Sequence, residues 1–309
     1  MATQKRYDVA IVGGGPAGLT AGIWLSRFLH RVAIFDKGDP RNWKTQGVHG
    51  FLGHDGIRPA LLRRRGRQEC RRYGADLVDL PITHAEAQGP ESLYLATEEG
   101  HEFNARRLLL ATGICDRWPE IPGLQRCFGT SVHTCPNCDG FESRQTPVVV
   151  LGAGERAALV ALAMLTWTDQ VRICTHGASP TFDELTAATL RRQEIPVDEL
   201  PIDCLLQTHR MVHHLQLIDG TLRRCEHIFL AMGQRGRDNL ADQLGCRRDE
   251  NGFVIVDDHH HSTVWNVFAV GDLTPGPQMA IRAAAEAAEA SLSIHHSLIP
   301  EDRRVHRRC

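Results

Sequence analysis

The sequence predicts an α/β protein with two domains, each built in three layers around a parallel sheet, the second inserted into the first. The length of 309 residues is sufficient for two domains with a hydrophobic core each. A short apolar strand enters a glycine-rich turn near the N-terminus, and the same pattern recurs in the middle of the chain. Two such units on one chain indicate two domains of the same general kind.

The first unit begins with the apolar run Tyr7–Val12, which predicts a β-strand. This strand leads into Gly13-Gly14-Gly15-Pro16-Ala17-Gly18, and an amphipathic helix is expected over Leu19–Leu29. A second apolar run, Val32–Phe35, ends at Asp36. The order strand, turn, helix, strand is that of a βαβ unit.

The three spaced glycines of this turn favour a Rossmann-like dinucleotide site. Gly13 allows a tight turn, Gly15 lets the backbone approach a pyrophosphate, and Gly18 allows close packing of the helix, whose N-terminus then faces the phosphates. Asp36 lies near the position where a carboxylate accepts a hydrogen bond from a ribose hydroxyl. The alternative is a glycine loop without a ligand.

The second unit repeats this order. A strand expected over Pro147–Leu151 enters Gly152-Ala153-Gly154-Glu155-Arg156-Ala157, an Ala/Leu-rich helix continues to about Thr166, and a further strand is expected over Val171–Cys174. One glycine match of this kind is a weak signal, but two in the context of strand, loop and helix are specific.

Three further strand-then-glycine patterns set the expected domain bounds. Leu108–Ala111 followed by Thr112-Gly113 precedes a proline-bearing stretch that predicts a domain crossing. Later in the chain come Ile228–Ala231 with Gly233, and Val267–Val270 with Gly271-Asp272. The first domain is therefore expected over residues 1–114 and 247–309, and the inserted domain over residues 115–246.

One pair of cysteines has a motif spacing. Cys135-Pro136-Asn137-Cys138 is a dithiol that can close within one turn, and such pairs often have one thiol with a depressed pKa. Asp139 follows directly and could protonate the leaving thiolate when the disulfide opens. The other cysteines are scattered and predict free thiols in a reducing compartment: Cys70, Cys115, Cys127, Cys174, Cys204, Cys225, Cys246 and Cys309.

A zinc site is the competing interpretation of the same stretch. His133, Cys135 and Cys138, together with the run His259-His260-His261, have the side chains that zinc prefers. No second pair of closely spaced cysteines is present, so no metal is predicted.

Composition excludes several classes of protein. The formal net charge of −2 and an ordinary apolar fraction argue against nucleic-acid binding and against disorder. No apolar run is long enough to span a bilayer, and Met1–Tyr7 is too polar for a signal peptide, so a cytoplasmic protein without membrane contact is expected. An arginine cluster over residues 63–72 could dock an acidic partner or be a solvated helix face. The basic tail, residues 303–309, ends in a thiol and is expected to be a frayed terminus.

With both glycine motifs, the Cys135-x-x-Cys138-Asp139-Gly140 box and the Gly271-Asp272 box in this order, the chain resembles the low-molecular-weight thioredoxin reductases over essentially its whole length. The resemblance implies a homodimeric enzyme with bound FAD. It implies that Cys138 faces the flavin and that Cys135 engages the substrate, either a thioredoxin-like protein or a small-molecule dithiol or disulfide.

The Gly271-Asp272 box and the Ala-rich helix from Met279 have the form of a second flavin contact, where a helix N-terminus stabilises negative charge, although an ordinary packed helix would give the same pattern. By family position, His49 would act near the flavin as a base or cap, or make a structural hydrogen bond. The residues expected to contact FAD are Gly13, Gly15, Pro16, Ala17, Gly18, Asp36, Lys37, Asn42, His49, Thr112, Gly113, Gly271, Asp272, Gln278, Met279 and Ala280.

The second glycine motif departs from the family pattern. Members that use NADPH carry arginines after the second strand of the inserted domain, whereas here the stretch is Thr175-His176-Gly177-Ala178-Ser179-Pro180. NADPH is therefore not expected as the donor, and a second FAD, or NADH, would fit the intact glycines. The residues of this second site are Gly152, Gly154, Glu155, Arg156, Ala157, His176 and Gly233.

The segment from Asp39 to Gly53 also resembles a branch without NADPH motifs, which includes dithiol oxidases of disulfide-containing natural products and diflavin-linked disulfide oxidoreductases. Three functions therefore remain open. The first is a disulfide reductase that receives electrons from an unidentified donor other than NADPH. The second is a dithiol oxidase that passes electrons to oxygen, and the third is a non-enzymatic redox sensor or zinc-binding protein. The sequence favours the two enzymes.

Overall fold

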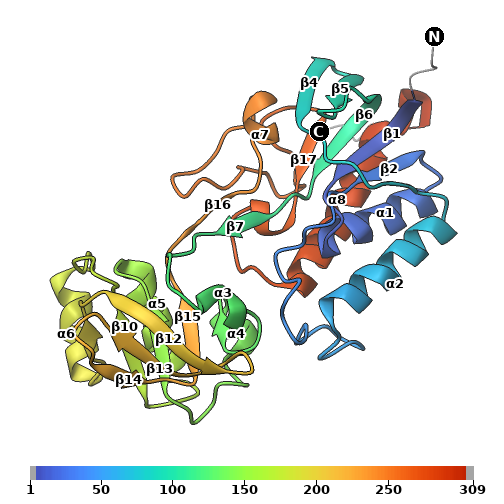
Figure 1. The fold of residues 1–309 in the computed structure, drawn as a ribbon. Helices are drawn as coiled ribbons and strands as arrows, with labels where there is room; N and C mark the ends of the chain where they lie inside the picture. Colours follow the sequence, from blue (N-terminus) through green and yellow to red (C-terminus); the bar gives the residue numbers. More distant parts are fainter. Residues whose placement is uncertain (1–4, 304–309) are drawn as a thin grey trace. The chain divides into compact units, whose positions relative to one another are not determined.

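The computed structural model describes residues 5–303, which form two compact units (Figure 1). The first unit contains the chain up to Trp43, Pro59–Cys115 and the chain from Gly236 onward. The second contains Lys44–Arg58 and Asp116–Arg235. Residues 304–309, and with them most of the basic tail, lie outside the described part.

The first unit is built on a seven-stranded sheet of order β3-β2-β1-β6-β5-β4, with β17 also paired to β6. Strands β1, β2, β3, β6 and β17 are parallel, whereas β4 and β5 form an antiparallel hairpin against β6. Their bounds are β1 Lys5–Val12, β2 Val32–Phe35, β3 Asp76–Val78, β4 His84–Gly89, β5 Ser92–Ala96, β6 Glu102–Leu110 and β17 Val267–Ala269.

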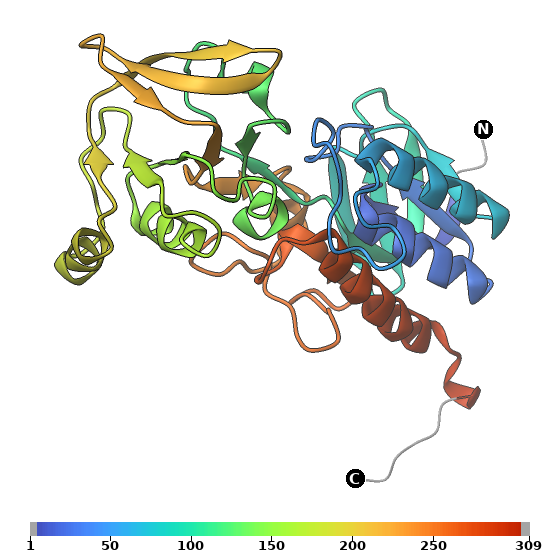
Figure 2. The ribbon, with the colours of Figure 1, turned by 90° about the horizontal axis from the view of Figure 1, so that it is seen from below.

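Helices cover one face of this sheet. Helix α1 (Pro16–Arg27) lies beside α8 (Ala280–Leu298), as Figures 1 and 2 show, and the alanines of α8 pack with Val9 and Ile11 of β1 in one apolar cluster. Cys70 of α2 (Pro59–Arg72) completes that cluster. The opposite face packs against α7 (Leu240–Gln243) and the chain that follows it.

The second unit has a parallel sheet of order β11-β10-β9-β15-β8 and a separate antiparallel sheet of order β12-β13-β14. The parallel strands are β8 Val132–His133, β9 Val148–Leu151, β10 Val171–Cys174, β11 Val197–Asp198 and β15 His227–Leu230. The antiparallel strands are β12 Ile202–Thr208, β13 Met211–Leu217 and β14 Leu222–Arg224.

Three layers result in the second unit. One face of the parallel sheet packs on α5 (Glu155–Met164) and on Leu190 of α6 (Glu184–Arg192), and the other packs on apolar side chains of β12 and β13. Two short helices, α3 (Leu124–Cys127) and α4 (Pro136–Asp139), complete this unit. The strand and helix positions expected from the glycine patterns agree with these elements, although the antiparallel strands were not predicted.

The chain passes between the units four times, at residues 43–44, 58–59, 115–116 and 235–236. Residues 44–58 were expected in the first domain, whereas the structure groups them with the second unit. The last two crossings lie in β7 (Ile114–Asp116) and β16 (Gln234–Gly236), which pair with one another. The return occurs earlier than the expected position near Cys246, because Leu240, Ala241 and Leu244 pack into the core of the first unit. None of the helices among residues 5–303 has the length and apolar character needed to cross a membrane.

Candidate active site and nucleotide loops

The first glycine loop is shaped by backbone contacts. Gly13 adopts φ of 114°, and a Cβ there would overlap the carbonyl group of Ala111. A Cβ on Gly18 would overlap the carbonyl oxygen of Gly13, so α1 starts against the turn. Pro16 occupies the first turn of α1, where its missing N–H costs nothing.

Two features of this loop fit a bound pyrophosphate cofactor. A Cβ built on Gly15 meets no protein atom within 4 Å, so this side of the turn is open to a ligand. Thr112, whose backbone N lies 3.1 Å from a Cβ built on Gly13, has a buried Oγ1 that has no hydrogen-bond partner within residues 5–303. A buried hydroxyl without a partner costs free energy. Thr112 Oγ1 and the open side of Gly15 are therefore suited to a polar ligand group that lies against the loop.

Asp36 lies over the same loop, since a Cβ on Gly14 would overlap its carboxylate. Its Oδ1 accepts a hydrogen bond of 3.1 Å from the N–H of Gly38, and its Oδ2 pairs with Arg63 and lies 3.6 Å from Arg67. Part of the arginine cluster on α2 therefore faces this carboxylate rather than solvent alone. The arginines that lie against the Asp36 carboxylate thus come from the first unit itself.

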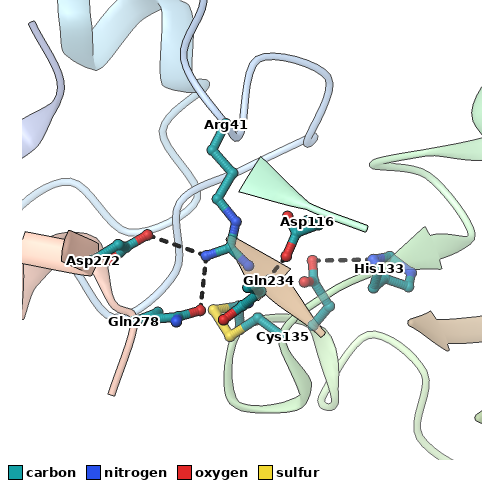
Figure 3. Close-up of a disulfide and its surroundings, with 9 residues drawn as sticks. Arg41, Asp116, His133, Cys135, Gln234, Asp272 and Gln278 are labelled. Atoms are coloured by element: carbon teal, nitrogen blue, oxygen red, sulfur yellow. Dashed lines mark hydrogen bonds and ion pairs between the residues drawn. A yellow bond between two sulfur atoms is a disulfide. The ribbon is translucent and has the colours of Figure 1, made fainter. Parts of the chain in front are cut away.

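A second cluster of polar groups lies where β17 ends. Gly271 adopts φ of 75° and is followed by Asp272, which Arg41 contacts at 3.1 Å. Arg41 Nη1 also donates to Gln278 Oε1 at 3.0 Å, one residue before the N-cap Met279 of α8 (Figure 3). Arg41 is not among the predicted FAD-contact residues, because its only signal in the sequence is a cation in the loop after β2.

The second glycine loop differs from the first because Thr181, from the segment before α6, contacts it. The N–H of Thr181 donates to the carbonyl of Ala153 at 2.8 Å, and Thr181 Oγ1 lies 3.5 Å from a Cβ built on Gly154. At the start of α5, Glu155 Oε1 accepts from Thr186 Oγ1 at 3.3 Å. A carboxylate at this helix N-terminus occupies the place where a phosphate group would be stabilised.

The residue in the ribose-reading position of the second unit is Thr175. Its side chain is buried, and Oγ1 donates to the carbonyl of Ala178 at 2.6 Å. His176 adopts φ of 53°, and its Nδ1 accepts from the N–H of Ile202 at 3.0 Å. Both side chains are therefore used to hold the loop after β10.

The remaining residues predicted to contact a nucleotide lie in the two loop regions, and their contacts to a ligand stay predictions. In the first unit, Ala17 is buried in α1, Lys37 is exposed after β2, Asn42 lies beside Arg41, Gly113 follows Thr112, and Ala280 begins α8. In the second, Ala157 is buried in α5, Arg156 is exposed, and Gly233 accepts from the N–H of Arg117 at 3.0 Å.

The two motif cysteines form a disulfide, Cys135–Cys138, at the start of α4. Helix α4 begins at Pro136, and the N–H groups of Cys138 and Asp139 both donate to the carbonyl of Cys135. The cysteines are only partly buried, so a thiolate from outside can reach them. Because a disulfide sulfur has no thiolate to give to a metal, this form leaves zinc without the two sulfur ligands that were considered.

Asp139 is joined to a pair of buried histidines. Its Oδ1 lies 3.3 Å from His133 Nδ1, the ion pair drawn from His133 in Figure 3. On the other side of the ring, His133 Nε2 lies 3.0 Å from His227 Nδ1. Burial, and then the neighbouring His133 ring, lower the pKa of His227 to about 4. The sequence indicated His133 only as a zinc ligand and gave no sign of His227, whose partner is distant in the chain.

His49 lies in the second unit, exposed, with Nδ1 3.8 Å from Asp55 and Nε2 3.6 Å from Glu142. Its expected role beside the flavin stays a prediction. Within residues 5–303, no three His, Cys, Asp or Glu side chains gather closely enough to hold a metal ion, and His260 instead pairs with Glu289 at 3.2 Å.

A disulfide beside a carboxylic acid, on a frame with two glycine loops of the dinucleotide-binding type, defines the class of disulfide oxidoreductases. The chain belongs to the pyridine nucleotide-disulphide oxidoreductase family, whose model matches residues 7–287. It is an FAD-dependent disulfide oxidoreductase, and its resemblance to the low-molecular-weight thioredoxin reductases is confirmed.

Similar proteins agree with that family. The thioredoxin reductase tcpT of Claviceps purpurea is 30% identical over 88% of this chain and 88% of its own length. The crystal structure of HlmI superposes with a TM-score of 0.90 at 28% identity, covering 98% of this chain and 95% of HlmI. The atypical thioredoxin reductase TRi of Desulfovibrio vulgaris Hildenborough is 31% identical, with a TM-score of 0.52, covering 96% and 98% of the two chains.

Proposed function

We propose that the chain passes electron pairs between a dithiol or disulfide substrate and FAD through the Cys135–Cys138 disulfide, with Asp139 as the acid and base. The observation that carries this proposal is the disulfide itself, formed at the start of α4 and followed directly by a carboxylic acid. In this reaction a substrate thiolate attacks Cys135, and Cys138 leaves as a thiolate that takes a proton from Asp139.

The first unit would hold the FAD. The open side of Gly15 and the partnerless Thr112 Oγ1 suit the pyrophosphate, and Asp36 suits a ribose hydroxyl. Asp272, Gln278 and the N-terminus of α8 would hold the other end of the cofactor, with Arg41 fixing the first two side chains. When bound, FAD would supply a second two-electron redox centre to exchange an electron pair with the Cys135–Cys138 disulfide.

NADPH is a poor candidate for the electron donor. Residues 175–180 offer no arginine or lysine to a 2′-phosphate, and Thr175 is buried and hydrogen-bonded within its own loop. A second FAD, or NADH, is compatible with the glycine spacing of the second loop, although that loop is hydrogen-bonded through Ala153 to the N–H of Thr181. We therefore expect one FAD per chain, with a second FAD as the alternative.

A dithiol oxidase that passes electrons to oxygen is the second candidate function. The missing 2′-phosphate contacts favour it, since an enzyme that delivers electrons to oxygen needs no pyridine nucleotide. A homodimer in the cytoplasm is expected from the family pattern and the composition. A thioredoxin-like substrate is supported by the names of similar proteins such as tcpT of Claviceps purpurea.

The proposal is tested by releasing and counting the flavin, then by mixing the oxidised protein anaerobically with NADPH, NADH or a dithiol while following flavin absorbance. We expect about one flavin per chain and reduction by the dithiol alone. Two flavins without reduction by pyridine nucleotides would establish the second site. Rapid reduction of a single flavin by NADPH would restore an ordinary reductase and contradict our donor assignment.

Substitution of the disulfide gives the matched test of the cysteines. Cys135→Ser and Cys138→Ser should each lower dithiol turnover by roughly 1,000-fold or more, because each removes one sulfur of the exchanging bond. Cys204→Ser is the control, since Cys204 is a free, partly exposed thiol on β12 of the same unit. Turnover that survives in either motif variant would end the assignment of the pair.

A further inference from the structure

A row of three side chains leads away from the disulfide inside the second unit. Asp139 follows Cys138 in the chain and lies 3.3 Å from His133 Nδ1, and His133 Nε2 lies 3.0 Å from His227 Nδ1. The first contact is an ion-pair distance without a well-directed hydrogen bond. Such contacts in resting enzymes often tighten only when substrate binds.

The sheet places the two histidines next to each other. Strands β8 and β15 run parallel, with Ile228 opposite Val132 and Phe229 opposite His133. The two imidazole rings are stacked at 5.2 Å between centroids, and the ring of Phe229 lies 5.2 Å from that of His133. His133 is 5% exposed and His227 is 7% exposed, so protein encloses most of both side chains.

Burial favours the neutral form of the His227 ring, and a neutral ring is what a relay requires. The pKa of His227 is lowered by burial and by His133, while the carboxylates of Glu226 and Asp139 oppose that shift. These three groups are the charged or titratable neighbours of His227, and Glu226 is itself paired with Arg224 at 2.9 Å. A neutral imidazole has one donor and one acceptor nitrogen, so it can accept a proton on one side and release one on the other.

We propose that His133 and His227 are positioning residues that orient the Asp139 carboxyl group and carry its proton to and from solvent. This inference rests on the proposed role of Asp139 as the acid and base for Cys138. Two buried histidines at hydrogen-bond distance are otherwise unfavourable at a sheet edge, where apolar side chains would pack without a desolvation cost.

The proton transfers balance as follows for an external dithiol such as dithiothreitol. Its thiolate attacks the sulfur of Cys135, the Cys135–Cys138 bond breaks, and Cys138 leaves with the electron pair and takes the proton of Asp139. His133 Nδ1 returns a proton to Asp139, His133 Nε2 takes one from His227 Nδ1, and His227 Nε2 takes one from solvent. The second thiol of the reagent then closes its cyclic disulfide and releases Cys135 as a thiol.

The test uses the full-length, FAD-loaded protein and measures the rate of flavin reduction by dithiothreitol across pH. The variants are His133→Gln and His227→Gln, in which an amide can keep a hydrogen bond but cannot carry a proton, and Asp139→Asn. His213→Gln is the matched control, because His213 is an exposed histidine on β13 of the same unit. Each rate is measured at constant pH and ionic strength with increasing concentrations of a small buffer acid such as imidazole.

We expect the rate to fall roughly 10- to 100-fold in His133→Gln and less in His227→Gln, with a changed pH profile, and to recover with buffer concentration in these two variants only. His213→Gln should behave as the native protein. A slow variant with a native pH profile and no recovery would mean that the histidines serve the structure alone, and native rates in both would equally overturn the relay. A native rate in Asp139→Asn would instead contradict the proposed function, so the two failures are distinguishable.

Discussion

The two glycine loops of this chain begin with the same strand, turn and helix, yet they differ in what surrounds the turn. At the first loop, Gly15 faces no protein atom and Thr112 Oγ1 lacks a partner among the described residues. At the second, Thr181 is bonded to Ala153, and Glu155 stands at the helix N-terminus. The glycine pattern therefore identifies the turn, whereas the residues after the second strand decide what can bind there.

The second strand of each unit makes the same point. Asp36 directly follows strand β2, and its carboxylate lies over the glycine loop and is balanced by Arg63 and Arg67. Strand β10 ends before Thr175, which is buried and hydrogen-bonded to Ala178. The first unit thus has a carboxylate at this position that can accept a hydrogen bond from a ligand. At the equivalent position of the second unit, the side chain of Thr175 is hydrogen-bonded within its own loop.

Among tests of the two loops, the largest expected effect comes from adding one methyl group to each loop at the middle glycine. Gly15→Ala would place a Cβ where no protein atom lies, so the free protein should keep its stability while affinity for FAD falls by roughly 100-fold through a clash with the pyrophosphate. Gly154→Ala meets only Thr181 Oγ1 at an ordinary contact distance of 3.5 Å. Flavin content and thermal unfolding of the two variants measure the difference.

This pair of variants can also break the comparison. If the second loop held FAD, Gly154→Ala would lower the flavin count per chain while leaving the first site filled. If Gly15→Ala kept its flavin, the first loop would not be the pyrophosphate site. Unchanged flavin in Gly154→Ala together with loss in Gly15→Ala is the result that the two geometries predict.

The second prediction concerns the acid stability of the second unit, which has no expected ligand to support it. Because the folded pKa of His227 is depressed to about 4, the neutral ring stabilises the fold above the unfolded value of 6.5, and this contribution is lost as pH falls toward 4. The difference amounts to about 3 kcal/mol. Denaturant unfolding at several pH values should show a smaller loss in His227→Gln than in the native protein.

His213→Gln serves as the control for that experiment, since an exposed histidine on the same unit should leave the pH dependence as it is. An equal loss of stability in the native protein and in His227→Gln would show that other groups govern the acid response.

Added FAD should raise the stability of the first unit only, by about 2.7 kcal/mol at one hundred times its dissociation constant.

The sequence predicted the parallel strands and the redox pair because each has a local signal. Val32–Phe35 is a short apolar run, Val171–Cys174 is apolar except for Arg172, and the structure has β2 and β10 at these bounds. The spacing of Cys135 and Cys138 allowed a disulfide, the family resemblance implied one, and the structure contains it. In both cases, neighbouring residues carry the whole pattern.

The antiparallel strands and the second-layer contacts lacked such a signal. Strands β12 and β13 are joined through His209 and Arg210, with φ of 51° and 70°, where a hairpin turn would ordinarily have Asn or Gly. Arg41 reaches Asp272, and His133 reaches His227, across long stretches of sequence. Such contacts depend on which strands become neighbours, and sequence spacing alone does not contain that information.

The smallest expected effect tests the partnerless hydroxyl at the first loop. Thr112→Val keeps the shape of the side chain and removes a buried Oγ1 that has no partner within residues 5–303, so the flavin-free protein should gain about 1 kcal/mol of stability. If that oxygen contacts FAD, the same change lowers FAD affinity by about 5-fold, measured by flavin fluorescence titration.

Thr181→Val is the matched control at the second loop, where the exposed hydroxyl makes a long contact of 3.4 Å to Ala153. Because the two substitutions are chemically identical, a loss of affinity confined to Thr112→Val assigns the cofactor to the first loop, and an equal effect in both would remove the distinction between the loops.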